Sequence, residues 1–535
     1  MSFYAEDVAQ QFDLSPDAIA TTANDCIGRM NTYLKQNGGM QIPSFVAKLP
    51  SGSEKGTFLT VDLGGTNCRV NSVELHGDST YTIAQAKHVV PRRVMINASH
   101  EPLFDFIAEK IQDFLGAHSK ADARDCSPLM DKNDYRKLAF IFSFAYTSIS
   151  LHEGVVLQWD KGWDIPSAIG RDPCKMLQEA LDRLKLSVRV VALTNDSVGT
   201  LMAHAYTSQS NISPLMGTVF GTGTNAAYLE RMESITKLHT ANGHDDYCKF
   251  GSMVINTEWG AWFDKDAEML PTTSYDKLLD AASGDPGTHL LEKRVSALYL
   301  GELVRLVIIN MMKEDLLDMK AEQASSPLFT QYGLGAAFLS QLAADKSDQL
   351  QQIIPSISST LQVQNVSNTD ARALRVISMA IVRRAARLAG AAIGAVIVQS
   401  GQLNCKDSVS GSVTSMCEDS GTVGGSRNPP TPLAKGLAAS GSMLRESATC
   451  CEEQIKPPVH FRPSRETKAE RDTQCFIEVG VDGSLFEHYP TFEEDIRAAI
   501  RDVPQIGLQG ESRVKMRLIQ DGSSVGGALV AQSVW

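Results

Sequence analysis

Apolar and polar positions alternate in two periods along the chain, and these periods predict its elements. Residues Pro16–Lys35 and Leu103–Leu115 have apolar side chains three and four apart, which predicts two amphipathic helices. Apolar β-type runs at Phe58–Leu63 and Cys68–Glu74 flank the tight Gly64-Gly65 turn, and this pattern predicts a β-hairpin. The long apolar stretch Leu374–Val398 predicts a buried, alanine-rich helix, because its arginines argue against a membrane span.

Two further apolar runs predict buried strands that end in polar side chains. Residues Leu138–Phe144 lead into a polar segment from Ser143 onward, and Val188–Leu193 are followed by Thr194, Asn195 and Asp196. Polar groups at the ends of buried strands commonly line a cleft. We therefore expect these two segments to contribute to one site.

A second strand, glycine turn and strand unit follows later in the chain. The strands are Met216–Phe220 and Ala226–Leu229, and the turn between them reads Gly-Thr-Gly-Thr-Asn. The duplication predicts two similar lobes, each offering backbone N–H groups to the same ligand.

Composition changes between Gly401 and Thr473, where serine, glycine, proline and threonine replace large apolar residues. A segment this poor in apolar residues cannot bury a core. We expect a disordered insertion over residues 402–473, with ordered strand resuming near Cys475–Val481. It is interpreted as a tolerated surface loop, with phosphorylation or a regulatory protein partner as the alternatives.

The overall composition narrows the class of protein. The chain has 535 residues, of which 43% are hydrophobic and 21% charged, as in a soluble enzyme of more than one domain. The net charge is −12, and the chain has no block of basic residues, which argues against nucleic-acid binding. No secretory signal is evident at the start of the sequence, and the ten cysteines show no metal or disulfide spacing. We expect reduced thiols, a cytoplasmic location and no membrane partner.

Glycine-rich turns provide the candidate phosphate-binding chemistry. The segment Asp62–Asn67 reads Asp-Leu-Gly-Gly-Thr-Asn directly after a predicted strand, so successive N–H groups can converge on phosphate oxygens. It is neither a P-loop nor a dinucleotide fingerprint. On its own such a turn is weak evidence, but Gly221–Ala226, Gly480–Ser484 and Asp521–Ser523 follow in order. Asp196 alone has a plainer interpretation, as the cap of a helix that begins with the run Ser197–Tyr206.

Through these motifs, the sequence resembles the hexokinase family of the actin-like ATPase superfold, as a divergent fungal-type member. The resemblance runs from about residue 20 to the C-terminus, interrupted by residues 402–473. It is carried by the blocks LTVDLGGTNCRV, LTNDSVGT, FGTGTNAAYLE, NTEWGAW and EKRVSALYLGELVR. It implies an α/β, ribonuclease H-like fold with two lobes of mixed sheet around a cleft. The implied small lobe is 57–205 with 510–535 returning to it, and the large lobe is 1–56 with 206–509.

The resemblance also implies an activity and the residues that perform it. The activity is ATP-dependent phosphorylation of a hexose at its 6-hydroxyl, the first step of sugar metabolism. Asp196 matches the general base, and Lys161 matches the lysine beside the sugar. The implied sugar-binding positions are Ser143, Asp160, Lys161, Asn195, Asp196, Asn225, Glu258 and Glu292. The implied ATP-binding positions are Asp62, Gly64, Gly65, Thr66, Asn67, Arg69, Thr222, Gly223, Asp482, Gly483, Gly522 and Ser523. Mg²⁺ is expected to arrive with ATP, without a direct protein ligand, and Asp62 could hold it through water.

Three departures from the family pattern leave the substrate open. The segment Ser143–Ser148 has Ala145 in place of the usual proline, which relaxes a stretch that touches the sugar. Asp160 stands where the family has threonine, and its charge would repel a phosphate ~4 Å away by about 1 to 4 kcal/mol, depending on the dielectric. Ser524-Val525 replaces a preferred glycine-containing pair.

Three interpretations therefore remain. They are a kinase for glucose or a similar sugar, a kinase for N-acetylglucosamine, and a catalytically weak sugar sensor that regulates a partner.

Overall fold

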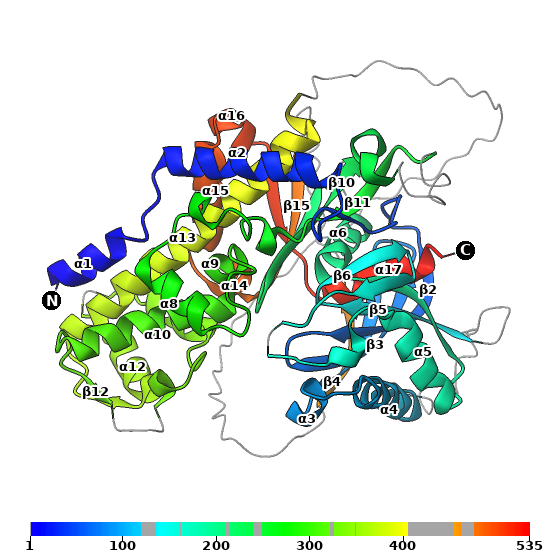
Figure 1. Cartoon of the computed structure of the whole chain (residues 1–535), viewed down its shortest axis with the longest axis horizontal. Helices are drawn as coiled ribbons and strands as arrows, with labels where there is room; N and C mark the ends of the chain where they lie inside the picture. The colour runs from blue at the N-terminus through cyan, green and yellow to red at the C-terminus, as the bar shows by residue number, and fades with distance from the viewer. Residues whose placement is uncertain are drawn as a thin grey trace, which may run out of the picture.

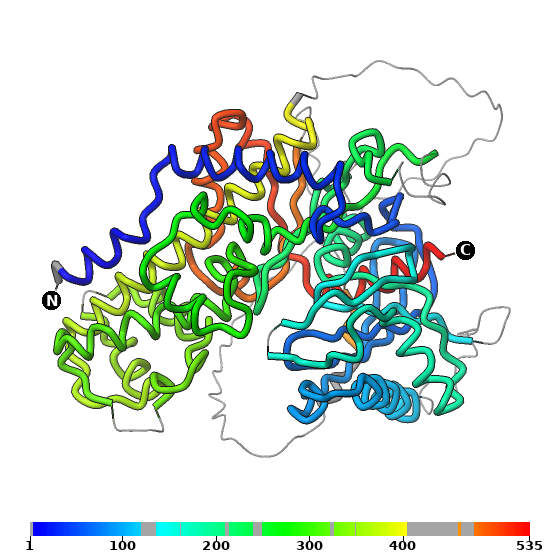
Figure 2. The backbone as a smooth tube through the Cα atoms, in the orientation of Figure 1, coloured from blue at the N-terminus to red at the C-terminus, as the bar shows by residue number. Residues whose placement is uncertain are grey.

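The computed structural model describes residues 2–118, 135–160, 162–208, 213–238, 249–321, 326–347, 349–404, 454–461 and 476–534. Two bodies are visible, one at each side of Figure 1, and the backbone tube of the described residues shows the same two bodies in Figure 2. The strands are β1 (Ile42–Pro43), β2 (Lys55–Leu63), β3 (Asn67–His76), β4 (Tyr81–Val89), β5 (Arg136–Phe142), β6 (Tyr146–Ser150), β7 (Glu153–Val156), β8 (Val188–Thr194), β9 (Met216–Phe220), β10 (Thr224–Arg231), β11 (Ser252–Asn256), β12 (Lys320–Ala321), β13 (Val363–Gln364), β14 (Gln454–Phe461), β15 (Ile477–Asp482) and β16 (Val514–Leu518).

The helices cover and connect these strands. They are α1 (Ser2–Gln10), α2 (Pro16–Tyr33), α3 (Arg92–Met95), α4 (Glu101–His118), α5 (Pro173–Arg183), α6 (Asp196–Thr207), α8 (Ser274–Ala282), α9 (Glu292–Val295), α10 (Ala297–Lys313), α11 (Ala336–Ala344), α12 (Ile353–Leu361), α13 (Asn368–Ser400), α14 (Ser484–His488), α15 (Phe492–Asp502), α16 (Gly507–Glu511) and α17 (Gly522–Gln532). In the part of the chain that is described, no helix is both long and apolar enough to cross a membrane.

Two sheets share one strand order, which confirms the duplicated strand and turn units expected from the sequence. In the small-lobe sheet the order is β14-β4-β3-β2-β5-β8, and in the large-lobe sheet it is β1-β11-β10-β9-β15-β16. Each has an antiparallel triple, β2-β3-β4 or β9-β10-β11, followed by two strands that add in parallel. The fold is therefore the expected α/β arrangement of two mixed sheets.

Helices α6 and α17 pack against each other between the two sheets. They contact where Gly199 meets Gly526, and a Cβ on Gly526 would lie 2.0 Å from the Gly199 carbonyl oxygen. Around them, one apolar core combines Val198 and Leu201 of α6 with residues of both sheets, such as Ala139 and Val254. Separate cores fill the two lobes. The N-terminus of α6, which carries Asp196, is thus held by rigid packing from both sides.

The long helix α13 forms the centre of the large lobe. It begins with a capping box, in which the Ser367 side chain accepts from the backbone of Asp370, and it ends at Gly401 in the left-handed conformation. One of its arginines, Arg384, is paired inside the protein, since both of its Nη atoms donate to the carboxylate of Asp276 at 2.6 and 2.7 Å. The prediction of a buried helix over Leu374–Val398 is confirmed.

Two of the expected boundaries need correction. Strand β14 lies within the insertion predicted to be disordered, yet it pairs antiparallel with β4 and extends the small-lobe sheet. Phe461 of β14 stacks on Tyr81 with ring centroids 4.9 Å apart, which gives this strand an apolar anchor. The rest of the insertion beyond residue 404 lies outside the described residues. Strand β16 lies within 510–535, but it pairs in parallel with β15 in the large-lobe sheet, so the return to the small lobe follows Leu518.

Candidate active site

One cavity of about 360 Å³ opens between the lobes, within the ~300–1,000 Å³ range of ligand pockets. It brings together almost all of the residues that the sequence assigned to sugar and nucleotide. The expected residues that line it are Asp62, Gly64, Gly65, Thr66, Asn67, Arg69, Ser143, Asp160, Asn195, Asp196, Thr222, Gly223, Asn225, Glu258, Glu292, Asp482, Gly483 and Ser523. Lys161 lies outside the described residues. Gly522 is not among the lining residues, although it begins α17 beside Ser523.

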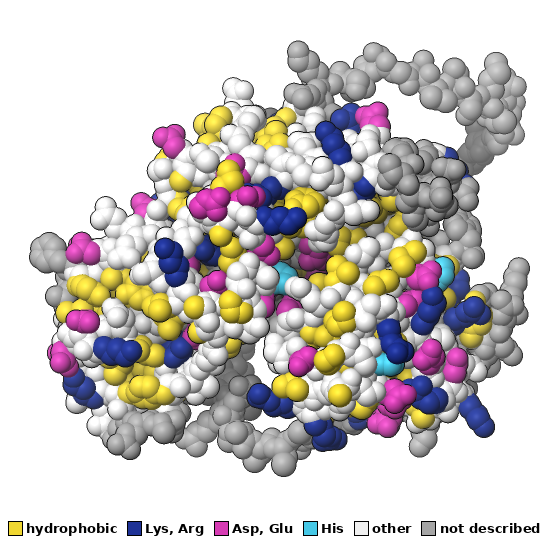
Figure 3. Space-filling view, viewed as in Figure 1, with side chains coloured by type: hydrophobic (Ala, Val, Ile, Leu, Met, Phe, Trp, Pro, Cys, Tyr) yellow, Lys and Arg dark blue, Asp and Glu magenta, His cyan; other side chains and the backbone are white. Residues whose placement is uncertain are grey.

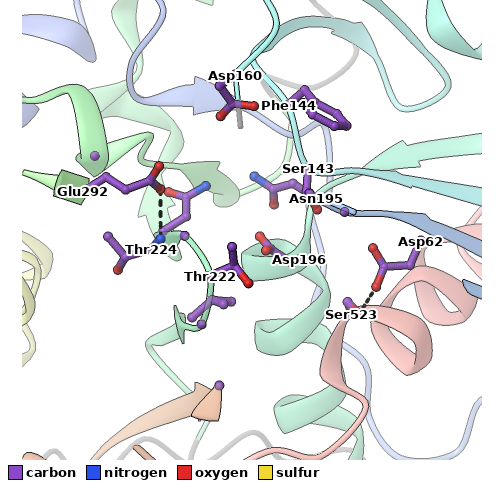
Figure 4. A pocket seen from close by; sticks show the side chains of 18 of the residues that line it. Asp62, Ser143, Phe144, Asp160, Asn195, Asp196, Thr222, Thr224, Glu292 and Ser523 are labelled. Atoms are coloured by element: carbon purple, nitrogen blue, oxygen red, sulfur yellow. Dashed lines mark hydrogen bonds between the residues drawn. The ribbon is translucent and has the colours of Figure 1, made fainter. Parts of the chain in front are cut away.

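Asn195 and Asp196 stand where β8 ends and α6 begins. The side-chain oxygen of Asn195 accepts from the backbone N–H of Val198 at 3.0 Å, so Asn195 is the helix cap. The alternative that Asp196 serves only as the cap is therefore wrong, because Asp196 is the first residue of α6 and lines the pocket. Figure 4 shows the Asp196 carboxylate between Thr222 and Asn195.

The amide nitrogen of Asn195 is an unsatisfied donor. Asn195 is 3% exposed, and its Nδ2 has no hydrogen-bond partner among the described residues. A buried donor without a partner costs about 1–3 kcal/mol, so such a group in a pocket is suited to a polar ligand. This donor lies next to the Asp196 carboxylate.

A polar network from the large lobe forms another wall of the pocket. The Nδ2 of Asn225 donates to Asn256 Oδ1 at 2.9 Å, and Asn256 Nδ2 donates to Glu258 Oε1 at 2.7 Å. Glu258 adopts the left-handed backbone conformation, with φ of 48°, at the start of a short 3₁₀ turn. Such a non-glycine conformation is costly, and it frequently marks a functional site. Carboxylates and amides together can both accept from and donate to sugar hydroxyls.

Glu292 is connected directly to the second glycine-rich turn. Its Oε2 accepts from the backbone N–H of Thr224 at 2.9 Å. Gly260 packs beside it so tightly that a Cβ there would lie 3.1 Å from the Glu292 Cβ. The Thr224 hydroxyl also accepts a hydrogen bond from the indole N–H of Trp259 at 3.1 Å. One carboxylate thus fixes the position of the turn that faces Asp196 in Figure 4.

The end of the pocket where the sequence predicts phosphate binding is built from the two glycine turns and the start of α17. The Asp62 carboxylate accepts from Arg69 Nη1 at 2.9 Å and from the Ser523 hydroxyl at 3.2 Å. Gly483, with φ of +114°, approaches the second turn so closely that a Cβ would lie 2.4 Å from the Phe220 carbonyl oxygen. Only glycine fits this close approach. The three chain segments therefore form one continuous polar surface.

Burial changes the protonation of Asp482. It raises the pKa of the Asp482 carboxyl to about 7; the backbone N–H of Gly483 lowers this pKa in part, and the charges of Asp196, Asp521 and Asp62 add to the rise. A carboxyl with such a pKa is partly neutral near physiological pH. The protein therefore carries less negative charge at this end of the pocket than its four aspartates suggest.

Nine further lining residues were not among the site residues assigned from the sequence. They include His289, Gly260 and Thr224, all from the large lobe. The signal for His289 was present in the polar turn Asp285-Pro-Gly-Thr-His289 just before Glu292, but a turn of this kind has many structural uses. Thr224 belongs to a strand start, and Gly260 matters only through its contact with Glu292.

Comparisons with known proteins agree with this geometry. Family models described as hexokinase match residues 4–206 and, for a second model, 215–422 and 443–533. A glucokinase of Aspergillus niger is 35% identical, and the match covers 98% of this chain and 95% of the relative. Glucokinase-1 of Saccharomyces cerevisiae is 32% identical over 94% and 89% of the two chains. The solved structure of a Schistosoma mansoni hexokinase complexed with glucose is 28% identical, covers 99% and 98%, and superposes with a TM-score of 0.75.

Proposed function

The chain belongs to the hexokinase family, and we propose that it transfers the terminal phosphoryl group of ATP to the 6-hydroxyl of glucose or a similar hexose. The observation that carries the proposal is the pair formed by a buried, unpartnered Asn195 amide and the adjacent Asp196 carboxylate. The relatives named above are glucokinases and a hexokinase, so the N-acetylglucosamine kinase and the sugar sensor are not favoured.

Asp196 is proposed as the general base. The hydroxyl oxygen forms a bond to the terminal phosphorus while the bond between that phosphorus and the bridging oxygen breaks. The hydroxyl proton passes to the Asp196 carboxylate, and the leaving group is ADP. General-base catalysis of this kind contributes roughly 10²–10⁴-fold in rate. Packing of α6 between the sheets supports this role, because a base must be held in a fixed position.

The sugar is proposed to lie against the polar walls that surround Asp196. Asn195 supplies a donor, Asn225 an amide, and Glu258 and Glu292 supply acceptors for the remaining hydroxyls. Ser143 and Asp160 approach from the small lobe, and Lys161 is proposed to lie beside them. Figure 4 shows Ser143 and Asp160 on elements separate from that of Glu292.

The nucleotide phosphates are proposed to lie on the glycine turns. Backbone N–H groups of residues 65–66 and 222–223 and the N-terminus of α17 provide donors without bulk positive charge, while the N–H groups of Gly64 and Gly221 close the two turns by donating to the carbonyls of Asn67 and Gly223. Arg69 can move from Asp62 to a phosphate oxygen. The side chains at this end include carboxylates and hydroxyls, the oxygen donors that suit Mg²⁺, and Asp62 is positioned to hold the ion through water. Mg²⁺ would neutralise charge on the phosphates.

The two lobes are proposed to close over both substrates and exclude water. We propose residues 57–205 and α17 as the core of one lobe, and residues 1–56 with 206–518 other than β14 as the other. A cytoplasmic location and a partner for the insertion remain predictions from the sequence.

A coupled assay for ADP tests the proposed function. The purified chain is incubated with ATP and Mg²⁺ and with glucose, fructose, mannose or N-acetylglucosamine in separate reactions. We expect ADP release with glucose well above the sugar-free rate. No ADP release with any hexose would contradict the proposal.

A further inference from the structure

His289 is the histidine among the side chains that line the pocket. It lies between α8 and α9, in a backbone conformation with φ of 52°. Its own N–H donates to Asp264 Oδ2 at 2.8 Å, and the next N–H, from Leu290, donates to Asp264 Oδ1 at 2.9 Å. Figure 3 shows a histidine with acidic side chains beside it in the hollow between the two lobes. The backbone is therefore fixed where it presents this ring to the pocket.

One edge of the ring is held by Asp285. The distance from His289 Nδ1 to Asp285 Oδ2 is 3.1 Å, and Asp285 is fixed in turn by Lys293, whose Nζ lies 3.2 Å from its other oxygen. The two ring nitrogens of an imidazole point in different directions. Because Nδ1 faces Asp285, Nε2 is the nitrogen on the opposite edge of the ring. The His289 side chain is 13% exposed, so little water competes for it.

Asp160 faces this part of the large lobe from the small lobe. Both residues line the pocket, and the negative charge of Asp160 acts on His289 and also on Tyr299 of α10. Burial alone would lower the pKa of His289, but the hydrogen bond to Asp285 and the charges of Glu292, Asp160 and Asp264 raise it to about 9. At neutral pH the ring is an imidazolium.

We propose that His289 is a sugar-positioning residue, whose cationic ring compensates the charge of Asp160 across the cleft and offers Nε2–H to a hexose hydroxyl. This proposal rests on the proposed function for the identity of the sugar, and it explains why a carboxylate is tolerated at position 160. Among the described lining residues the only other basic side chain is Arg69, which pairs with Asp62 at the phosphate end. Among the described residues that line the pocket, His289 is therefore the cationic side chain at the proposed sugar end.

Loss of the ring proton has a defined consequence. The charged groups around His289 are Asp264 and Asp285 from the flanking loops, Glu292 and Lys293 from α9, and Asp160 from the small lobe. Without the imidazolium, Asp160 and Glu292 repel each other across the cleft, and Nε2 turns from a donor into an acceptor. Both changes weaken the closed, sugar-bound arrangement. Affinity for the sugar is therefore expected to fall as the pH rises through about 9.

A double-mutant cycle on sugar affinity tests this proposal. The variants are His289→Gln, Asp160→Asn and the double variant, with His488→Gln as a control because that side chain is 62% exposed. Glucose dissociation constants are measured by tryptophan fluorescence, since Trp159 and Trp163 stack at 5.6 Å beside Phe144 of the pocket. Thermal unfolding of each variant is measured in parallel.

The expected results separate a positioning role from a structural one. His289→Gln should weaken glucose binding about tenfold in the wild-type background and less than about threefold with Asp160→Asn. Between about pH 7 and pH 10, the dissociation constant should rise at least about fivefold in the wild type and stay level in His289→Gln. Equal effects in both backgrounds, or a level wild-type pH profile, would overturn the proposal. Absence of ADP release with intact glucose binding would overturn only the proposed function, and absence of glucose binding by the wild type would overturn both.

Discussion

The Oε2 atom of Glu292 accepts a hydrogen bond of 2.9 Å from the backbone N–H of Thr224. The two residues are 68 positions apart, and the bond joins the proposed sugar wall to the glycine-rich turn proposed to hold phosphate. Figure 4 shows it as one of two dashed contacts in the pocket, the other joining Ser523 to Asp62. The proposed sugar and nucleotide ends of the pocket are therefore joined by a direct hydrogen bond within the protein.

Glu292→Gln tests this connection. The amide oxygen can still accept one hydrogen bond. The variant loses the negative charge that strengthens both the hydrogen bond from Thr224 and the hydrogen bonds from sugar hydroxyls. We expect glucose affinity to fall about tenfold, which corresponds to about 1.4 kcal/mol. The measurement is a fluorescence titration, with Glu233→Gln as a control because Glu233 is 73% exposed. Unchanged affinity would exclude Glu292 from the sugar wall.

Ser523→Ala should act on the nucleotide and spare the sugar. Its hydroxyl donates to Asp62 at 3.2 Å at the start of α17, and a hydrogen bond to a charged group contributes about 1.5–3 kcal/mol. We expect KM for ATP to rise at least about fivefold while KM for glucose stays within about twofold. Ser533→Ala is the matched control, since the Ser533 hydroxyl donates at 2.7 Å to the Val530 carbonyl in the last turn of the same helix. Equal effects on both substrates would contradict the assignment.

The raised pKa of Asp482 predicts how stability depends on pH. The native carboxyl has a pKa of about 7, above its ordinary value of 3.8, so the folded protein retains a proton that the unfolded chain loses. The free energy of unfolding should therefore fall as the pH rises from about 4 to about 7, and then level off.

Asp482→Asn should remove this part of the pH dependence and stabilise the protein above pH 7. Urea unfolding at about pH 5 and about pH 8 measures both quantities. Asp113→Asn, at a site 54% exposed, is the control and should leave the pH dependence as in the wild type. A pH dependence of Asp482→Asn identical to that of the wild type would contradict the raised pKa.

Strand β14 should be anchored mainly by one aromatic contact. Phe461→Ala removes the stack on Tyr81, so the β4 edge should exchange its amide hydrogens faster. Peptides that cover Tyr81–Val89 are followed by hydrogen exchange and mass spectrometry. Val459→Ala, at a position 54% exposed, should have no such effect. Unchanged exchange in Phe461→Ala would show that the strand is held by its backbone pairing alone.

The sequence was sufficient for the parts of the fold that depend on local pattern. Both hairpins around the glycine turns are present, as β2-β3 and β9-β10, because alternation and turn residues agree there. Helix α2 begins at Pro16 as expected, and its N-cap is Ser15. Asp196 was identified because strand-end polarity and a family block coincide at one residue.

What the sequence did not indicate depends on contacts between distant residues. The role of His289 becomes visible only when Asp285 fixes its ring and Asp160 faces it from the other lobe. Strand β14 was missed because its stabilising partners belong to β4, more than 360 positions earlier. The resemblance had likewise placed β16 in the wrong lobe, since its pairing with β15 is a tertiary choice.

The central claim is that Asp196 accepts the proton of the attacking hydroxyl, and Asp196→Asn tests it most directly. The measurement is kcat for glucose phosphorylation together with the glucose dissociation constant of the same preparation. We predict that kcat falls by roughly 10²–10⁴-fold, while the dissociation constant stays within about tenfold of the wild type. A folded Asp196→Asn variant that turns over glucose at the wild-type rate would contradict the account.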